Sequence, residues 1–335
     1  MPHKPLANLL IAAFLLLLSM VAVTQGSVPI AAGQLWQSLK LLATAASETE
    51  YAMAHRIIIE LRLPRVLLGL MVGAGLALTG LLLQTVTRNE LADPYLFGLS
   101  SGSAAGAVFV ITFTGDVLGL FTLPLAAMTG GLASVAAVLL LLRGYANHSP
   151  GQMILAGLSV SFLFNALTYG MTFLGDQRAA QTVLFWTMGG LGTARWNNLF
   201  LPFIGLATVL IFALRRNVAL DALLTGDLTA HSLGVAPEKL RQQTFLVCAM
   251  ATACFVATSG VIGFIGLMVP HLVRHWTGPL HRKAFLPTLL IGAALLVGSD
   301  LLSRILLAPQ ELPVGVITAG VGAIFVMRIV LRNSL

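Results

Sequence analysis

The residues with the clearest capacity for chemistry lie in one apolar stretch, GFIGLMVPHLVRHWTG, at positions 263–278. His271 and His275 are four residues apart, so they share one face of a helix, and two metal ligands can use that spacing. No second histidine pair and no carboxylate occupy matching positions. We therefore predict no metal site, and we expect a histidine here to bond a neighbouring helix and Arg274 to reach the interface or cap carbonyl groups.

The same stretch contains a proline that should interrupt a helix. Pro270 has no N–H to donate to the carbonyl of Gly266, and its ring crowds that carbonyl, so we expect a kink or break between these residues. Within a membrane, a broken helix is tolerated where protein or a water-filled cavity covers the freed backbone. Gly266 and Pro270 are therefore candidates for a functional helix break.

The composition of the chain places it in a lipid bilayer. Of its 335 residues, 57% are hydrophobic and 9% are charged, which leaves too little polar surface for a water-soluble protein of this length. The apolar runs last about 17 to 25 residues without alternation, as helical spans do and barrel strands do not. Cys248 and Cys254 lie within one apolar run and suggest neither a disulfide framework nor a metal cluster.

These runs predict an all-α, polytopic membrane protein with a single domain over residues 1–335. The ten expected spans are 6–23, 65–87, 98–113, 117–142, 152–174, 198–214, 243–260, 262–276, 284–304 and 314–331. The first segment could instead be a signal peptide, but its length, its poor cleavage site and the many later spans favour a membrane helix.

The distribution of basic residues predicts the orientation. With the N-terminus in the cytoplasm, twelve Lys and Arg residues lie inside and seven lie outside, which favours two cytoplasmic termini. The net charge of +7 is therefore a topology signal, and no nucleic-acid partner is expected.

Two connections are too long to be simple turns. The external one, 27–64, contains a segment at 31–46 with enough helical periodicity to lie on the membrane surface. The internal one, 215–243, is the most polar part of the chain. Asp227 is expected to be the N-cap of a short helix that Gly234 ends, and Pro237 to start a second one, so that the pair forms a cytoplasmic knob.

Small residues indicate close helix packing. Gly69, Gly73 and Gly80 fall near one face of the second span, where missing side chains allow another backbone to approach.

Five separated motifs resemble those of the FecCD family: LRLPRVLLGLMVGAGLALTGLLLQ, LADPYLFGLSSGSAAG, FWTMGGLG, GVIGFIGLMVPHLVR and ELPVGVITAGVGAIFV. They occur in this order over nearly the whole chain. The family comprises the membrane subunits of type II ABC importers for ferric siderophores, haem and cobalamin.

The resemblance implies a bacterial inner-membrane permease with ten helices per subunit and no cofactor. It pairs as a homodimer or with a related permease, receives substrate from a periplasmic binding protein, and sits on two ATPase subunits. This chain has no P-loop, so it is not itself expected to be an enzyme, and ATP hydrolysis belongs to the partner.

The resemblance also assigns roles to particular residues. Within GDLTAHSLGV, it implies that Asp227, Ala230, Leu233 and Gly234 couple the permease to the ATPase. The alternative is a solvated loop in which Leu-Gly merely ends a helix.

At the outer side, the resemblance implies that Arg62, Arg65 and Arg304 receive acidic residues of the binding protein. Asp300 is four residues before Arg304, so a purely structural ion pair is the alternative.

Asn89 and Leu91 match an inner gate motif, but Glu90 replaces the proline of that motif and puts the turn geometry in doubt.

The substrate is expected to be a ferric siderophore, the commonest cargo of the family, with haem and cobalamin left open. No set of histidines and tyrosines resembles axial haem ligation. A secondary transporter driven by protons or sodium, and a metal-ion permease, are the alternatives from other classes. A secondary transporter would need inward carboxylates on several spans, and only Asp300 is a clear candidate.

Overall fold

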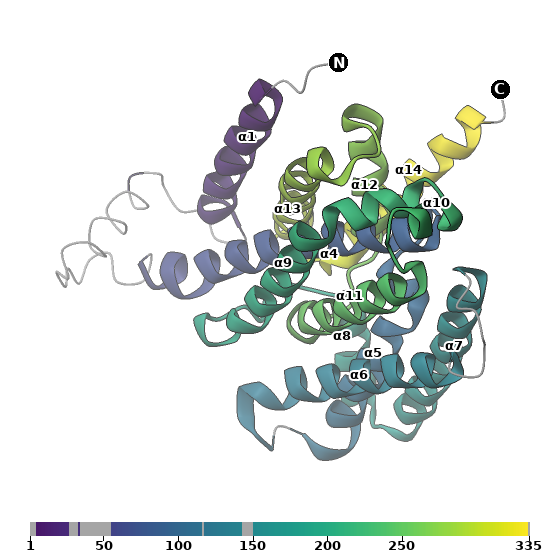
Figure 1. Cartoon of the computed structure of the whole chain (residues 1–335). Coiled ribbons are helices and arrows are strands. Elements are labelled where there is room, and N and C mark those ends of the chain that lie inside the picture. The colour runs from purple at the N-terminus through teal and green to yellow at the C-terminus, as the bar shows by residue number, and fades with distance from the viewer. Residues whose placement is uncertain (1–4, 27–32, 34–54, 116, 143–149, 334–335) are drawn as a thin grey trace.

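The computed structural model describes residues 5–26, 33, 55–115, 117–142 and 150–333, and its regular elements in these ranges are all helices (Figure 1). The long helices are α1 (Pro5–Thr24), α4 (Leu63–Thr87), α6 (Thr122–Leu142), α7 (Pro150–Leu174), α9 (Phe200–Leu224), α11 (Pro237–Ser259), α13 (His281–Ile305) and α14 (Val314–Asn333). Shorter helices are α5 (Leu99–Phe109), α8 (Gln177–Thr187), α10 (Asp227–Ser232) and α12 (Ile265–Thr277). Single turns or π-helical segments are η2 (Ile57–Arg62), η3 (Pro94–Phe97), η4 (Val110–Thr114), η5 (Gly119–Phe121) and η6 (Trp196–Asn198).

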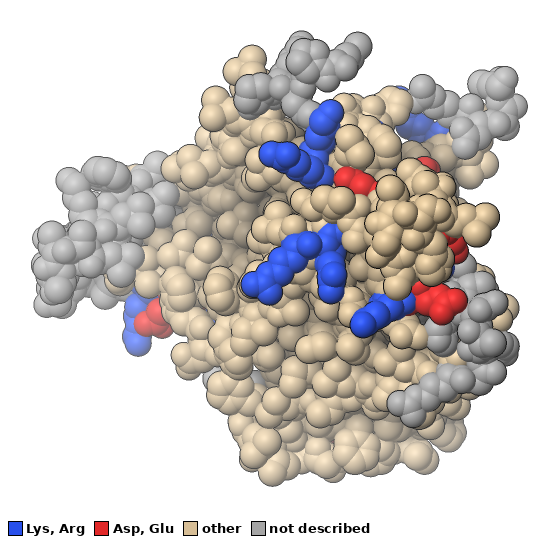
Figure 2. Space-filling view, in the orientation of Figure 1, with Lys and Arg blue, Asp and Glu red and all other residues tan. Residues whose placement is uncertain are grey.

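The all-α membrane architecture predicted from the sequence is confirmed. Eight helices in the described ranges are long and apolar enough to cross a membrane. The two other expected spans, 98–113 and 262–276, correspond to the shorter helical segment Leu99–Thr114 and to α12. Charged side chains are sparse over the described surface that Figure 2 shows, as a lipid-embedded bundle requires.

Helix α4 lies at the centre of the bundle and, with η2, is the most deeply buried of the eight candidate spans. It packs against α9, α11, α12 and α13. Pro64 is the second residue of α4, which continues directly from η2, and Arg88 ends the helix in the left-handed region with φ of 48°. The core of the protein is therefore built around one helix whose two ends carry arginines.

The predicted close packing at glycines is present on α4, but it involves two partner helices. A Cβ atom at Gly73 would collide with the carbonyl of Gly292 on α13, and one at Gly80 would collide with the carbonyl of Gly266 on α12. Gly69 faces Val297 of α13 and Leu191. Backbone-to-backbone contact of this kind is how helices associate tightly in a membrane.

The interruption predicted between Gly266 and Pro270 is not present, because α12 is continuous from Ile265 to Thr277. The chain is irregular from residue 260 to 264, where Phe264 adopts φ of 70°, and α12 then runs through Pro270. Pro270 leaves the carbonyl of Gly266 without its helical donor, and Gln84 Nε2 on α4 donates to that carbonyl at 3.3 Å. The neighbouring helix therefore replaces the missing hydrogen bond, and the helix continues through the proline.

Arg274 also contacts α4. Its Nη1 donates to Gln84 Oε1 at 3.1 Å and its Nη2 to the carbonyl of Leu81 at 3.2 Å, which confirms the expected carbonyl capping.

The long polar connection at 215–243 differs from the prediction in three ways. Helix α9 continues to Leu224, so its last three turns occupy the expected loop. The expected second short helix is the first part of α11, which does start at Pro237. The N-cap of α10 is Gly226, and Asp227 is the first helical residue, because its carboxylate is engaged by two arginines.

Two further sequence-based expectations concern other parts of the chain. Cys248 and Cys254 are buried free thiols, as predicted. The expected surface helix at 31–46 lies outside the described residues except for residue 33.

The contact between α4 and α12 generates a stability prediction. Gly80→Ala should destabilise the protein by about 1 to 3 kcal/mol or more, because a methyl group there meets backbone that cannot rotate away. Gly170→Ala on α7 is the matched control, since nothing lies within 4 Å of a Cβ atom at that position. Thermal unfolding in detergent should show a lowered midpoint for Gly80→Ala alone, and equal midpoints would contradict the packing argument.

Candidate functional site

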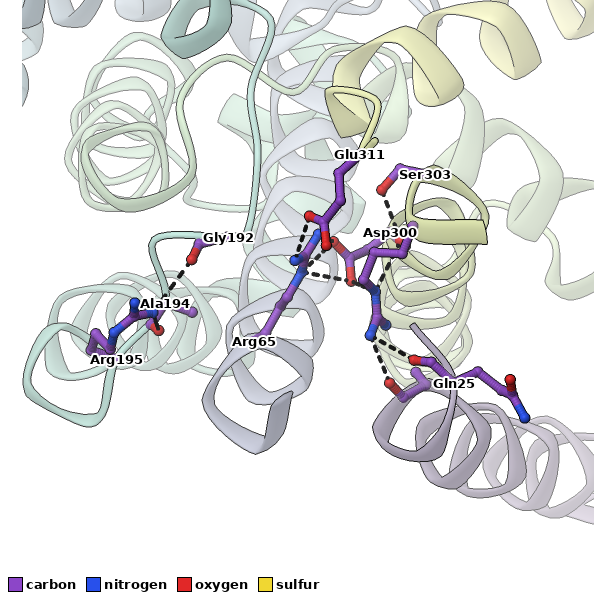
Figure 3. A network of polar contacts seen from close by, with 10 residues as sticks. Gln25, Arg65, Gly192, Ala194, Arg195, Asp300, Ser303 and Glu311 are labelled. Atoms are coloured by element: carbon purple, nitrogen blue, oxygen red, sulfur yellow. Dashed lines mark hydrogen bonds and ion pairs between the residues drawn. The ribbon is translucent and has the colours of Figure 1, made fainter. Parts of the chain in front are cut away.

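A network of ion pairs joins the N-terminal end of α4 to α13 (Figure 3). Arg65 approaches Asp300 with its Nε and its Nη2, each 2.9 Å from Oδ1, and its Nη1 lies 2.8 Å from Glu311 Oε2. Arg304 Nε lies 3.1 Å from Asp300 Oδ2. The pairing of Asp300 with Arg304 predicted from their spacing is therefore present. That Arg65 shares the same carboxylate could not be predicted from local spacing, because Arg65 and Asp300 are 235 positions apart.

Arg62 and Arg304 also hold the C-terminal end of α1. Arg62 Nη1 donates to the carbonyl of Val23 at 3.0 Å, and Arg304 Nη1 donates to those of Ala22 and Gln25 at 2.9 and 3.0 Å. The last carbonyls of a helix lack partners within the helix, and cations there complement its dipole. Two of the three arginines predicted to receive the binding protein, Arg62 and Arg304, therefore hold the C-terminal end of α1.

The three arginines line one cavity of about 340 Å³, which we call the arginine pocket. Its lining consists of Gly26, Ile57, Leu61, Arg62, Arg65, Gly192, Arg195, Arg304 and Glu311. Arg195 was not anticipated from the sequence. Its Nη1 donates to the carbonyls of Gly192 and Ala194. Four arginines and one carboxylate, that of Glu311, line the pocket, and the Asp300 carboxylate lies beside it against Arg65 and Arg304, so positive charge is in surplus there.

A second ion-pair group, which we call the Asp227 clamp, lies at the C-terminal end of α4. Asp227 Oδ1 accepts hydrogen bonds from Arg88 and from Arg241, the latter at 2.6 Å. Arg241 Nε also donates to the carbonyl of Val86 at 3.1 Å, and Arg88 Nε to that of Leu223 at 3.3 Å. Partial burial opposes ionisation, but Arg241 and then Arg88 outweigh it and hold the pKa of Asp227 below its usual value.

The clamp fixes the orientation of α10, the short helix expected to couple to the ATPase. Ala230 is fully buried and packs into the main core, so it seats the helix. Leu233 is 66% exposed and Leu228 is 86% exposed, so these two side chains form the free face. Gly234 ends the helix with φ of 79°, as predicted, and the N–H of Val235 bonds the carbonyl of Ala230.

The turn after α4 contains the predicted gate residues. Asn89 Oδ1 accepts the N–H of Leu91 at 2.9 Å, which closes the turn without the proline of the family motif. Leu91 is half exposed. Glu90 Oε2 lies 3.4 Å from His271 Nδ1, so this histidine contacts the turn after α4, whereas a bond to a neighbouring helix was expected. No group of three or more metal-ligating side chains occurs among the described residues.

Asp93, between α4 and η3, was not among the residues predicted from the sequence. Its Oδ1 accepts the N–H of Tyr95 at 2.9 Å, and Oδ2 is buried without a hydrogen-bond partner among the described residues. The Tyr95 hydroxyl in turn accepts the N–H of Ile262 at 2.9 Å, in the irregular segment between α11 and α12. Burial raises the pKa of Asp93 to about 6, although the backbone N–H groups of Tyr95 and Leu267 act in the opposite direction.

A cavity of about 370 Å³ lies between α5, α7 and α8. Its polar lining consists of Ser100, Ser101, Asn165, Thr168, Tyr169, Thr172 and Thr187. These groups can donate and accept hydrogen bonds, and none of the described residues around this cavity carries a formal charge at neutral pH.

The buried Asp93 carboxylate generates a pH-dependent prediction. Because its folded-state pKa of about 6 exceeds its ordinary value, its contribution to stability falls as pH rises from about 4 through 6. Asp93→Asn keeps an acceptor for the N–H of Tyr95 and cannot ionise. The variant should therefore be stabilised by roughly 1 to 3 kcal/mol at pH 8 and by less at pH 5.

Thermal unfolding at both pH values measures this difference. Asp176→Asn is the control, because Asp176 is an exposed N-cap residue that accepts the N–H of Ala179. An Asp93→Asn effect that is the same at pH 5 and pH 8 would contradict the assignment.

Comparisons with known proteins identify the relatives of this chain. The sequence is 35% identical to the hemin transport system permease protein of Yersinia pestis, covering 99% of this chain and 96% of that protein. It is 33% identical to the iron(3+)-hydroxamate import system permease protein of Bacillus subtilis, covering 83% of this chain and 84% of that protein.

A solved structure described as an inward-facing conformation of a metal-chelate type ABC transporter superposes with a TM-score of 0.84. It is 29% identical in sequence, and the superposition covers 99% of this chain and 100% of that one. The pattern of the FecCD transport family matches residues 12–332. The chain therefore belongs to the FecCD transport family and is a permease subunit of the type II ABC importer class.

Proposed function

We propose that this permease moves a bulky iron chelate, a ferric siderophore in the first place, from a periplasmic binding protein to the cytoplasm. The distribution of polar groups in the protein supports this cargo. Ion pairs gather at the two ends of α4, whereas the cavity between α5, α7 and α8 is lined by neutral hydroxyl and amide groups. A path without formal charge suits a large chelate that must be released again.

In this proposal the arginine pocket faces the periplasm and receives acidic side chains of the binding protein. Its surplus of positive charge supports that role, because opposite charges steer and orient association. The alternative role, neutralising Asp300 and capping α1, is compatible with docking. Arg65 has contacts to both a buried and an exposed carboxylate, and Arg195 hydrogen-bonds carbonyl groups only, among the described residues.

At the cytoplasmic side, the α10 helix of each permease chain would bind in a groove of one ATPase subunit. The exposed Leu228 and Leu233 support this role, because apolar side chains on a helix held by an ion-pair clamp form a firm contact surface. Asp227 would act by fixing α10 to α4 and α11. Two such chains, or one with a related permease, would enclose the path, with Asn89 and Leu91 near its inner closure and both chain termini in the cytoplasm of a bacterium.

Haem is the second candidate cargo, supported by the similarity to the hemin permease over nearly the whole chain. Cobalamin is a further candidate within the same family. The ion-gradient alternative is set aside, because the family consists of ABC importer permeases.

Transport by the reconstituted importer tests the cargo. Liposomes that contain the permease, its ATPase subunits and its binding protein should take up a ferric trihydroxamate in an ATP-dependent, vanadate-sensitive manner. Hemin and cobalamin, supplied separately, are the comparison substrates. Uptake of hemin without uptake of the hydroxamate would favour the second candidate, and uptake driven by an ion gradient without ATPase subunits would contradict the proposal.

The coupling role of α10 is tested at Gly234. A valine there is strained by about 1 to 2 kcal/mol at a positive φ, so Gly234→Val should shift the end of α10 and lower uptake severalfold while membrane insertion persists. Gly234→Asn is the matched control, because asparagine adopts the left-handed region more readily. Normal uptake by Gly234→Val, or equal loss in both variants, would argue against a coupling role that depends on this backbone geometry.

A further inference from the structure

We infer that Glu311 is an internal occupant of the arginine pocket, which a carboxylate of the binding protein replaces on docking. The inference rests on the docking role proposed above and deepens it. It identifies the contact that must open when the partner arrives, and the position on Arg65 that the partner's acidic side chain takes.

The contacts of Glu311 are those of a replaceable ligand. Its carboxylate lies 2.8 Å from Arg65 Nη1 and hydrogen-bonds no other side chain among the described residues. The side chain is 37% exposed. Exposed ion pairs contribute little to stability because water competes for both partners, so this one can be exchanged at low cost.

Asp300, the other carboxylate that contacts Arg65, is buried and shared. Its side chain is 3% exposed and contacts both Arg65 and Arg304. Removing one member of a buried ion pair leaves an uncompensated charge, which is strongly destabilising. Asp300 therefore holds Arg65 in place permanently, while Glu311 covers the one nitrogen that Asp300 leaves available, as Figure 3 shows.

The backbone around Glu311 is fixed independently of its side chain. The N–H of Leu312 donates to the carbonyl of Ser303 at 3.0 Å, and the N–H of Gln310 to that of Leu307 at 2.9 Å. The N–H of Val314 bonds the carbonyl of Gly189 at 3.1 Å. Glu311 can thus leave Arg65 by side-chain rotation alone, without movement of the segment between α13 and α14.

The consequence for binding follows from charge. With Glu311 turned away, the four arginines that line the pocket have no carboxylate among them, Asp300 still pairs with Arg65 and Arg304, and Arg65 Nη1 loses its partner. A carboxylate on the partner is the chemical group that fits, because it can repeat the contact that Glu311 makes. Glu311 thus competes with the partner and lowers its affinity.

The experiment measures the affinity of the full permease for the importer's own binding protein, at low and at physiological ionic strength. Glu311→Gln should tighten binding by about two- to tenfold at low salt, and by less at higher salt. Glu60→Gln is the matched control. It removes the same charge from the same end of α4, but Glu60 lies against Arg56 at 3.7 Å and does not line the pocket. In an Arg65→Gln background, Glu311→Gln should give no gain beyond that of Glu60→Gln.

The outcomes separate this inference from the docking proposal. If Arg62→Gln, in protein of unchanged thermal stability, binds the partner as tightly as the wild type does, the docking proposal fails. If Arg62→Gln weakens binding but Glu311→Gln behaves like Glu60→Gln, docking stands and the role of Glu311 is wrong. Weaker binding by Glu311→Gln would also overturn it, since Glu311 would then attract the partner.

Discussion

The backbone contact of α4 with α12 and α13 is the constraint on which the other features depend. Gly73 against Gly292 and Gly80 against Gly266 leave no room for side chains, so three helices are held at the smallest separation that polypeptide allows. This separation brings Gln84 within reach of the carbonyl that Pro270 leaves free. It also sets Arg65 beside Asp300, because the same pair of helices carries both residues.

Two carboxylates, Asp300 and Asp227, each connect helices through ion pairs with two arginines. Asp300 connects α4 with α13, and Asp227 connects the end of α4 with α10 and α11. Each is shared by two arginines, and three of these four, Arg304, Arg88 and Arg241, also donate hydrogen bonds to backbone carbonyls. Glu311 contacts only the side chain of Arg65 among the described residues and does not connect two helices through a shared carboxylate.

Much of the fold could be predicted from local signals, and much of the site could not. Apolar run lengths predicted the membrane helices, and the glycine after Leu233 predicted the end of α10, because both depend on neighbouring residues alone. The interruption predicted between Gly266 and Pro270 was wrong, because Gln84, 182 positions before Gly266, donates to the carbonyl that Pro270 leaves free. Asp227 was predicted to be an N-cap because its two arginine partners, at positions 88 and 241, cannot be recognised without the fold.

The attachment of α1 has a consequence for how the protein is made. Its described contacts gather at one end, and one arginine that binds its last carbonyls is encoded 282 positions after Ala22. During synthesis α1 therefore enters the bilayer long before α13 exists to receive it. Its mean hydropathy of 2.6 is the highest among the candidate spans, and only 11% of the span is buried inside the protein. Both properties suit a helix that is surrounded by lipid until α13 has been made. The contact of α1 with α13 can therefore form only after α13 has been made.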